Sequence, residues 1–181
     1  MDRDVALSLV KERIKNKNLI KHMLATEAIM RHLARHFSED ENEWGLAGLL
    51  HDLDYSETYD NPGIHGLRTA EMLKDTDVSP SVIHAILAHA NKVPLDGLID
   101  KAIYATDPLT GFLVACALMT SDKKMSSTTV DFALRRFKEK AFAKGASREQ
   151  MSSCKDFGFS LEDFMALGIK AMTEISDKLG L

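Results

Sequence analysis

Apolar residues recur along the chain at the three- and four-residue spacing of α-helices, and no segment alternates with a period of two. The clearest case is the segment 18–37, where one side of a helix would carry Leu19, Met23, Met30, Leu33, Ala34 and Phe37. The same spacing predicts further helices over 41–53, 61–74, 79–92, 97–120, 126–143, 147–155 and 160–179. The pattern therefore predicts an all-α fold.

Prolines mark two of these expected helices. Asn61 followed by Pro62 resembles a capping residue with proline at the first helical position, so a helix should begin there. Pro108 lies inside the long apolar segment 97–120, where proline should break, bend or open a helix.

The composition is that of an ordinary globular domain. The chain has 181 residues, of which 45% are hydrophobic, and this is enough for one core. We therefore expect residues 1–181 to form a single domain. The net charge of −4 gives no support for broad binding to nucleic acids or membrane surfaces. We accordingly expect no nucleic-acid polymer among the partners.

The cysteines and the apolar stretches bear on the cellular compartment. Cys116 and Cys154 form no CxxC pair, which argues against a disulfide framework and a thiolate zinc site. The first residues lack the apolar core of a signal peptide. The longest uncharged apolar stretch is shorter than the roughly 20 residues of a membrane span. These features predict a cytoplasmic protein with no membrane partner, and they leave the oligomeric state open, a homo-oligomer included.

The most informative stretch is AGLLHDLDYSET, in which an apolar run ends at His51 and Asp52. A His-Asp dipeptide says little alone, so the test is whether other ligand-type residues face the core. Rotation by about 100° per helical residue places His22 and His89 beside buried faces. Each of them, taken singly, is equally well explained as a hydrogen-bonded histidine at the margin of the core. The same rotation directs the remaining helical histidines to solvent, namely His32, His36 and His84.

Asp107 stands in a segment that is otherwise uncharged and mostly apolar. A buried carboxylate without a partner costs several kcal/mol, so Asp107 needs a cation or several hydrogen bonds. The alternative is that Asp107 caps a helix that begins at Pro108. Imidazole and carboxylate ligands without thiolates suit Mn, Fe, Ni, Co or Zn, and suit Mg less well.

The order of these residues resembles the HD-domain superfamily of metal-dependent phosphohydrolases. The neighbourhoods AGLLHDLD, HGLRTAEML, IHAILAHAN and ATDPLTGFLVA are similar to its small bacterial members, although HDLD stands where many members have HDIG. The resemblance implies an HD-type helical bundle with its core at about 18–120. The C-terminal helices, at about 126–179, would pack on that core.

The resemblance also implies a ligand set. His22, His51, Asp52 and Asp107 would hold a first divalent ion. In members with a second ion, further histidines lie between the HD pair and the last aspartate. His65 and His89 fit that position here, with Asp52 bridging the two ions. One or two ions are therefore expected.

The implied activity is hydrolysis of a phosphate mono- or diester of a small molecule, with a nucleotide as the expected substrate. A divalent ion lowers the pKa of its bound water, and the resulting hydroxide attacks phosphorus in line, with Asp52 as the bridging ligand. Arg68 and Lys92 each follow a histidine by three residues and so share its helix face. Both could hold phosphate, or could be solvated ends of their helices. Asp54 could position water or protonate a leaving group, or could cap a turn.

A few further residues are weaker candidates for the site, and two other functions are possible for the same ligand set. Asn91 and Thr110 could hydrogen-bond the ligands or the substrate, and the basic stretch 134–149 reads more simply as a solvated helical face. The same ligand set also occurs in relatives that are dinuclear iron oxygenases. A non-catalytic, nucleotide-binding HD module is the third hypothesis.

Overall fold

Two long helices, α2 (Lys17–Phe37) and α7 (Leu98–Leu118), form the centre of the fold in the computed structural model, which describes residues 1–181. No strand is present, so the predicted all-α fold is confirmed. The other α-helices are α1 (Arg3–Arg13), α3 (Glu41–Leu50), α4 (Tyr55–Thr58), α5 (Leu67–Leu73), α6 (Pro80–His89), α8 (Val130–Phe137), α9 (Arg148–Ser152), α10 (Leu161–Thr173) and α11 (Ser176–Leu179). Three 3-10 turns join them, at Pro62–Ile64, Met125–Ser127 and Ser153–Phe157.

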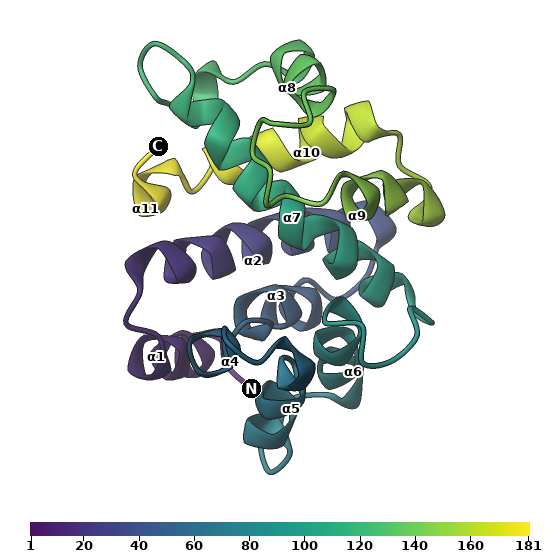
Figure 1. Ribbon diagram of the computed structural model, residues 1–181. Coiled ribbons are helices and arrows are strands. Elements are labelled where there is room, and N and C mark those ends of the chain that lie inside the picture. Colours follow the sequence, from purple (N-terminus) through teal and green to yellow (C-terminus); the bar gives the residue numbers. More distant parts are fainter.

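The remaining helices lie on two sides of α2. Helices α1 and α3 to α6 lie on one side, and α8 to α11 on the other (Figure 1). One hydrophobic cluster of 40 buried residues extends from Ala6 to Leu179 and so includes both sides. The assignment of the chain to a single domain with an HD core stays a prediction. None of the helices has both the length and the apolar character needed to cross a bilayer.

Helices α2 and α3 approach each other unusually closely at Gly48. A β-carbon added there would lie 2.8 Å from the backbone nitrogen of Glu27 and the carbonyl group of Thr26. Real β-carbons do not approach other atoms so closely, and glycine alone has none. Helix α3 begins at Asp40, whose side chain accepts bonds from two backbone N–H groups of the first turn. Every residue of α3 from Trp44 onward is buried.

Helix boundaries differ from the prediction where local backbone geometry intervenes. The helix expected to begin at Asn61 is delayed, because Gly66 takes a φ of 78° and α5 begins only after it. Helix α7 is not broken at Pro108, which it contains in its interior. Asp107 is therefore not a helix cap, and that alternative is wrong. Helix α1 was not anticipated.

Candidate metal centre

Six predicted ligands, four histidines and two aspartates, converge at one place between α2, α3, α6 and α7. The imidazole rings form a row in which successive ring centroids are 4.9 Å (His22–His51), 5.0 Å (His51–His89) and 5.0 Å (His89–His65) apart. Two triads within the set have ligand atoms that all lie within 4.8 Å of one another, namely His22–His51–Asp107 and His51–Asp52–His89. Residues more than 80 positions apart in the chain therefore meet here.

The row divides into two half-sites. Half-site 1 consists of His22, His51 and Asp107. The Nε2 atom of His22 lies 3.0 Å from His51 Nε2 and 3.2 Å from Asp107 Oδ1. Half-site 2 consists of His65 and His89, whose Nε2 atoms lie 3.1 Å apart. Each half-site thus presents imidazole nitrogens to a common centre.

Asp52 lies between the half-sites and turns one carboxylate oxygen toward each. Its Oδ2 atom is 3.4 Å from His22 Nε2 and 3.6 Å from His51 Nε2. Its Oδ1 atom is 3.3 Å from His65 Nε2 and 3.7 Å from His89 Nε2. This is the arrangement expected of a carboxylate that bridges two ions.

The Nδ1 atom of every histidine in the row is held by an acceptor on the outer side of the ring. His51 donates to the Gly48 carbonyl over 2.8 Å, and His89 donates to the Ile86 carbonyl. His65 donates to Asp54 Oδ1 over 2.7 Å. These bonds place a proton on each Nδ1 atom and direct each Nε2 atom inward, where it can bind a proton or an ion.

Thr110 completes the same pattern for His22. Its hydroxyl donates to the Asp107 carbonyl over 2.9 Å, so it can only accept from His22 Nδ1, which is 2.7 Å away. Thr110 is therefore an orienting residue for His22. Asn91, the other weaker candidate, lies at the rim of the adjoining cleft.

Two of the histidines stand at the carboxyl ends of short helices. His51 follows α3, and His89 ends α6. The last carbonyls of a helix lack helical partners, which explains how each ring bonds the carbonyl three residues before it. The negative ends of both helix dipoles also face the centre, where they would stabilise a cation.

The pKa shifts show how strongly the carboxylates favour positive charge at the centre. Burial opposes protonation of His22, yet Asp107 and Asp52 raise its pKa to about 10. His65 behaves alike, since Asp52 and Asp54 overcome burial and raise its pKa to about 9. Burial lowers the pKa of His51 to about 4. The pKa of Asp52 is lowered by the histidines around it, against the effect of its own burial.

The donor set fits divalent cations. Inward-facing lone pairs on Nε2 atoms about 3 Å apart repel one another unless a proton or a cation lies between them. Carboxylate oxygens face both histidine pairs, and imidazole with carboxylate suits Mn, Fe, Co, Ni and Zn. The residues therefore form a group able to hold metal, as HD domains do, and they do not identify the metal.

A cleft of about 480 Å³ leads from the surface to the centre. Its deep part is formed by Asp52 and His89, which are buried, whereas the Asp107 side chain at the rim is 33% exposed. Tyr55 and Gln150 also line the cleft, and the Tyr55 ring lies edge-on to His65 at 5.7 Å. Sequence reasoning missed both residues. Tyr55 follows the HDLD motif directly, which is the one signal that could have found it.

Three predicted catalytic residues do not present their charged groups to this cleft. Arg68 is exposed and its guanidinium pairs with Glu71 on the same helix. Lys92 Nζ donates to the carbonyls of Pro62 and Gly63, at 3.1 and 2.9 Å. The structure thus assigns both cations to other partners.

Asp54 is fully buried and points away from the cleft. Besides His65, its carboxylate accepts from the backbone N–H groups of Gly66 and Thr69, at 2.8 and 3.0 Å. These bonds hold the start of α5, and they lower the pKa of Asp54 against the effect of its burial. Asp54 therefore orients His65 and holds the start of α5, and it does not line the cleft.

The segment 138–147, between α8 and α9, covers one side of the centre. Lys144 and Gly145 line a hollow of about 380 Å³ together with His22 and Asp107. Arg148 fixes this segment by donating to five backbone carbonyls, of Phe137, Glu139, Phe142, Ala143 and Ala146. Part of the basic stretch is therefore an ordered cover, and not a solvated helical face.

The other histidines lie outside the centre. His36 is exposed and packs on Phe159 with ring centroids 4.7 Å apart. His32 pairs with Glu174 at 2.9 Å, and His84 pairs with Asp100 at 3.1 Å. Both are partly buried and lie outside the centre, as expected of residues predicted to point toward solvent.

Comparison with known proteins identifies relatives of the chain. The family description of the HD domain matches residues 19–117, more than half of the chain. Ribonuclease Y of Oleidesulfovibrio alaskensis is 30% identical over 96 residues, covering 53% of this chain and 18% of that protein. Ribonuclease Y of Sulfurovum sp. is 27% identical over 166 residues, covering 90% of this chain and 33% of that protein. The chain thus spans a third or less of the length of these curated relatives. No solved structure matches it.

These relatives overturn one expectation. They are ribonucleases, enzymes that act on RNA, so the expectation that no nucleic-acid polymer is a partner is wrong. The net charge of −4 was the basis of that expectation. Net charge describes the whole surface and not the potential inside a cleft, where bound cations dominate.

The matched segment, 19–117, contains all six residues of the centre, from His22 to Asp107. These residues lie on α2, α6 and α7, at the end of α3, and on the turn before α5. The chain belongs to the HD-domain superfamily.

Proposed function

We propose that this protein is a metal-dependent phosphohydrolase that cleaves a phosphate ester of a nucleotide, either free or within RNA. The observation that carries the proposal is the position of Asp52, with one oxygen toward each half-site. Two adjacent divalent ions can stabilise both the attacking and the leaving oxygen of an in-line displacement at phosphorus. The ribonucleases among the relatives support a nucleotide unit as the substrate.

In this proposal, half-site 1 and half-site 2 would each hold one divalent ion through the Nε2 atoms and Asp52. When bound, the ions supply a water of lowered pKa and polarise the phosphoryl oxygens. The chain's own contribution is orientation. Thr110, Gly48, Asp54 and Ile86 fix the four rings through Nδ1, so no ring has to reorganise when a substrate arrives.

We assign the phosphate contact to Lys144. Arg68 and Lys92 are engaged elsewhere, whereas Lys144 is exposed and lines the hollow beside Asp107. Its ammonium would offset the negative charge of the phosphoryl group. Lys140 is an exposed lysine of the same segment that does not line the hollow, so it provides a matched control.

The proposal is tested by a substrate panel in which the purified protein is supplied with Mn, Fe, Co, Ni, Zn or Mg. The panel contains nucleoside monophosphates, cyclic nucleotides and short single-stranded RNA. We expect release of phosphate, or of new RNA ends, only with an added ion. Asp52→Asn should be inactive, and His36→Gln, which changes a histidine outside the centre, should match the wild type. Equal turnover by Asp52→Asn and the wild type would refute the proposal.

The same panel separates hydrolysis from oxygenation. The donor set of four imidazoles and two carboxylates also suits a pair of iron ions. Hydrolysis proceeds equally with and without dioxygen, whereas an oxygenase consumes it. Turnover that stops under anaerobic conditions would therefore establish the dinuclear iron oxygenase in place of the phosphohydrolase.

A further inference from the structure

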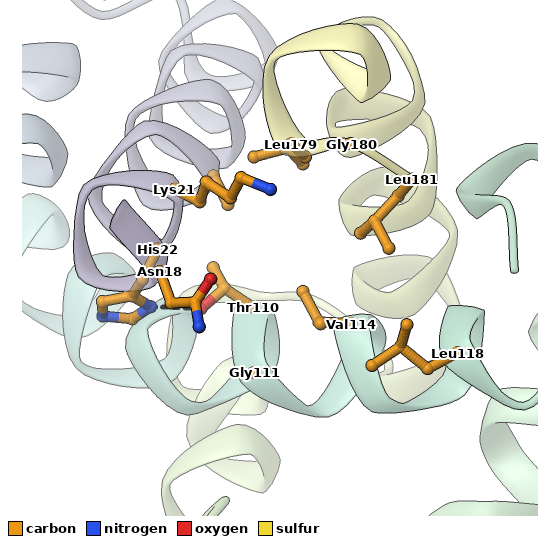
Figure 2. A pocket seen from close by; sticks show the side chains of 11 residues that line it. Asn18, Lys21, His22, Thr110, Gly111, Val114, Leu118, Leu179, Gly180 and Leu181 are labelled. Carbon is orange, nitrogen blue, oxygen red and sulfur yellow. Dashed lines mark hydrogen bonds between the residues drawn. The ribbon is translucent and has the colours of Figure 1, made fainter. Parts of the chain in front are cut away.

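A second hollow lies behind His22, on the side of the ring that faces away from Asp52. Its volume is about 390 Å³, within the range of about 300–1,000 Å³ that small-molecule sites occupy. Figure 2 shows Val114, Leu118 and Leu181 on its walls, and the hydrogen bond from His22 to Thr110 at its inner end. A single imidazole ring therefore separates this hollow from half-site 1.

Polar groups occur at one end of the otherwise apolar walls. Lys21 extends its amino group into the hollow, and Asn18 lies beside His22 (Figure 2). No side chain of the protein pairs with the Lys21 ammonium, and the Asn18 side chain also makes no hydrogen bond within the chain. Thr110 is already fully engaged by His22 and Asp107. The unused donors suit a flat, apolar group that has hydrogen-bond acceptors along one edge, which describes a nucleobase.

Gly111 connects this hollow with the one that contains Lys144 and Asp107, because it lines both. A β-carbon added to Gly111 would meet no atom within 4 Å. Gly111 is exposed, whereas two buried helix glycines are closely packed: a β-carbon would lie 2.8 Å from backbone at Gly48 and 2.8 Å from the Leu113 side chain at Gly168. Glycine destabilises a helix interior relative to alanine. Packing explains Gly48 and Gly168, and it does not explain Gly111.

We propose that the hollow behind His22 binds the base of the nucleotide substrate, and that the sugar and phosphate pass over Gly111 to Lys144 and the half-sites. This inference rests on the proposed phosphohydrolase function, and it adds a base subsite and a path to it. The base would contact the apolar walls with its faces and Lys21 and Asn18 with its acceptor edge.

The test compares binding of a nucleoside monophosphate with that of ribose 5-phosphate, which lacks the base. Equilibrium dialysis without metal measures both affinities independently of turnover. We expect the wild type to bind the nucleotide at least about tenfold more tightly, a difference of about 1.4 kcal/mol. Gly111→Ala should keep this preference, because the added methyl group meets nothing. Gly111→Leu should abolish it by obstructing the path.

Val114→Phe provides a second variant, which fills the hollow from its wall without changing the helix glycine. It should also remove the preference for the nucleotide, and thermal melting would show whether each variant folds. Equal affinity of the wild type for both ligands, or an unchanged preference in both Gly111→Leu and Val114→Phe, would overturn the base subsite. Loss of turnover on every ester with the binding preference intact would instead overturn the proposed function and leave the subsite standing.

Discussion

Half-site 1 and half-site 2 each present two imidazole nitrogens and one oxygen of Asp52, yet they are built on different parts of the fold. Half-site 1 takes its residues from α2, α7 and the end of α3, which are packed in the centre of the molecule. In half-site 2, His89 ends a buried helix, but His65 lies on the turn before α5. His65 owes its position to Asp54 and not to the core. Core packing therefore fixes one half-site, and a local hydrogen-bond network fixes the other.

The largest effect is expected for the residue that the half-sites share. Asp52→Asn removes a carboxylate charge from both, so both ions should be lost. Mutation of a residue that hydrogen-bonds a metal ligand lowers metal affinity or activity by about 10- to 100-fold. Loss of the shared ligand itself should therefore lower phosphate-ester hydrolysis by more than about 100-fold. Metal analysis after gel filtration measures the bound ions. Two ions retained by Asp52→Asn would show that the half-sites are independent.

Substitution of one histidine in each half-site tests whether core packing holds half-site 1 and the Asp54 hydrogen-bond network holds half-site 2. His65→Gln should release the ion of half-site 2 and leave half-site 1 loaded. His51→Gln should release the ion of half-site 1 and also lower the melting temperature, because His51 is fully buried beside Gly48. Each substitution should lower phosphate-ester hydrolysis by about 100-fold, which is the upper end of the effect of losing a residue that hydrogen-bonds a metal ligand. Metal stoichiometry and thermal melting are the measurements. Equal melting temperatures for the two variants would contradict the comparison.

Substitution of the residues that accept from the Nδ1 atoms should reveal the same difference between the half-sites, with smaller effects. Asp54→Asn removes the charge from the Nδ1 acceptor of His65 in half-site 2, and Thr110→Val removes the Nδ1 acceptor of His22 in half-site 1. We expect metal affinity to fall by about 10- to 100-fold, in the affected half-site only. Asp54→Asn should have the larger effect, because Asp54 also holds the start of α5. Isothermal titration with Mn²⁺ resolves the two affinities. A larger effect of Thr110→Val would reverse the interpretation.

The smallest difference between the half-sites is expected in the pH dependence of their metal affinities. The carboxylates raise the pKa of His22 to about 10 and that of His65 to about 9, so both are protonated at neutral pH. An ion must displace these protons, so affinity should rise by about tenfold per pH unit for each. The rise should level off near pH 9 for half-site 2 and near pH 10 for half-site 1. Titrations with Mn²⁺ between pH 6 and pH 10, without oxygen, would measure the common slope and the two pH values at which the rise ends, and a flat profile would contradict the assignment.

Without ions the stability should follow the opposite trend. A histidine whose folded pKa exceeds its unfolded value of 6.5 contributes stability below pH 6.5. This contribution is lost as the pH rises through the folded pKa, first for His65 and then for His22. Thermal melting of the chelator-treated protein should therefore show a falling midpoint above neutral pH, in the range where metal affinity increases.

Helix rotation pointed to two of the four histidines of the centre, whereas His51 and His65 were included because of the resemblance to the HD-domain superfamily. His22 and His89 were placed beside buried faces from their spacing alone, and both line the centre. Asp107 was singled out by its apolar surroundings, and it lies there as well. These residues lie on helices whose rotation is fixed by the core, so sequence periodicity describes them well.

The sequence was less informative for long charged side chains that have several possible hydrogen-bond partners. Arg68 does not share a helix face with His65 as predicted, because His65 lies on the turn before α5, and Arg68 pairs with Glu71 on its own helix. Lys92 donates to the carbonyls of Pro62 and Gly63, which lie about 30 positions earlier in the chain and carry no signal in the helical spacing. The position of Lys144 depends on a web of carbonyl bonds to Arg148, which has no periodic signature.

Gly48 has a consequence for the choice of ion. Its missing side chain sets how closely α3 approaches α2, and the ring of His51 is anchored to its carbonyl. The gap between His22 on one helix and His51 at the end of the other therefore follows from this contact. A cation is admitted or rejected according to its radius as much as its affinity for imidazole. The size of the ion that half-site 1 would hold therefore depends on a residue that carries no ligand atom.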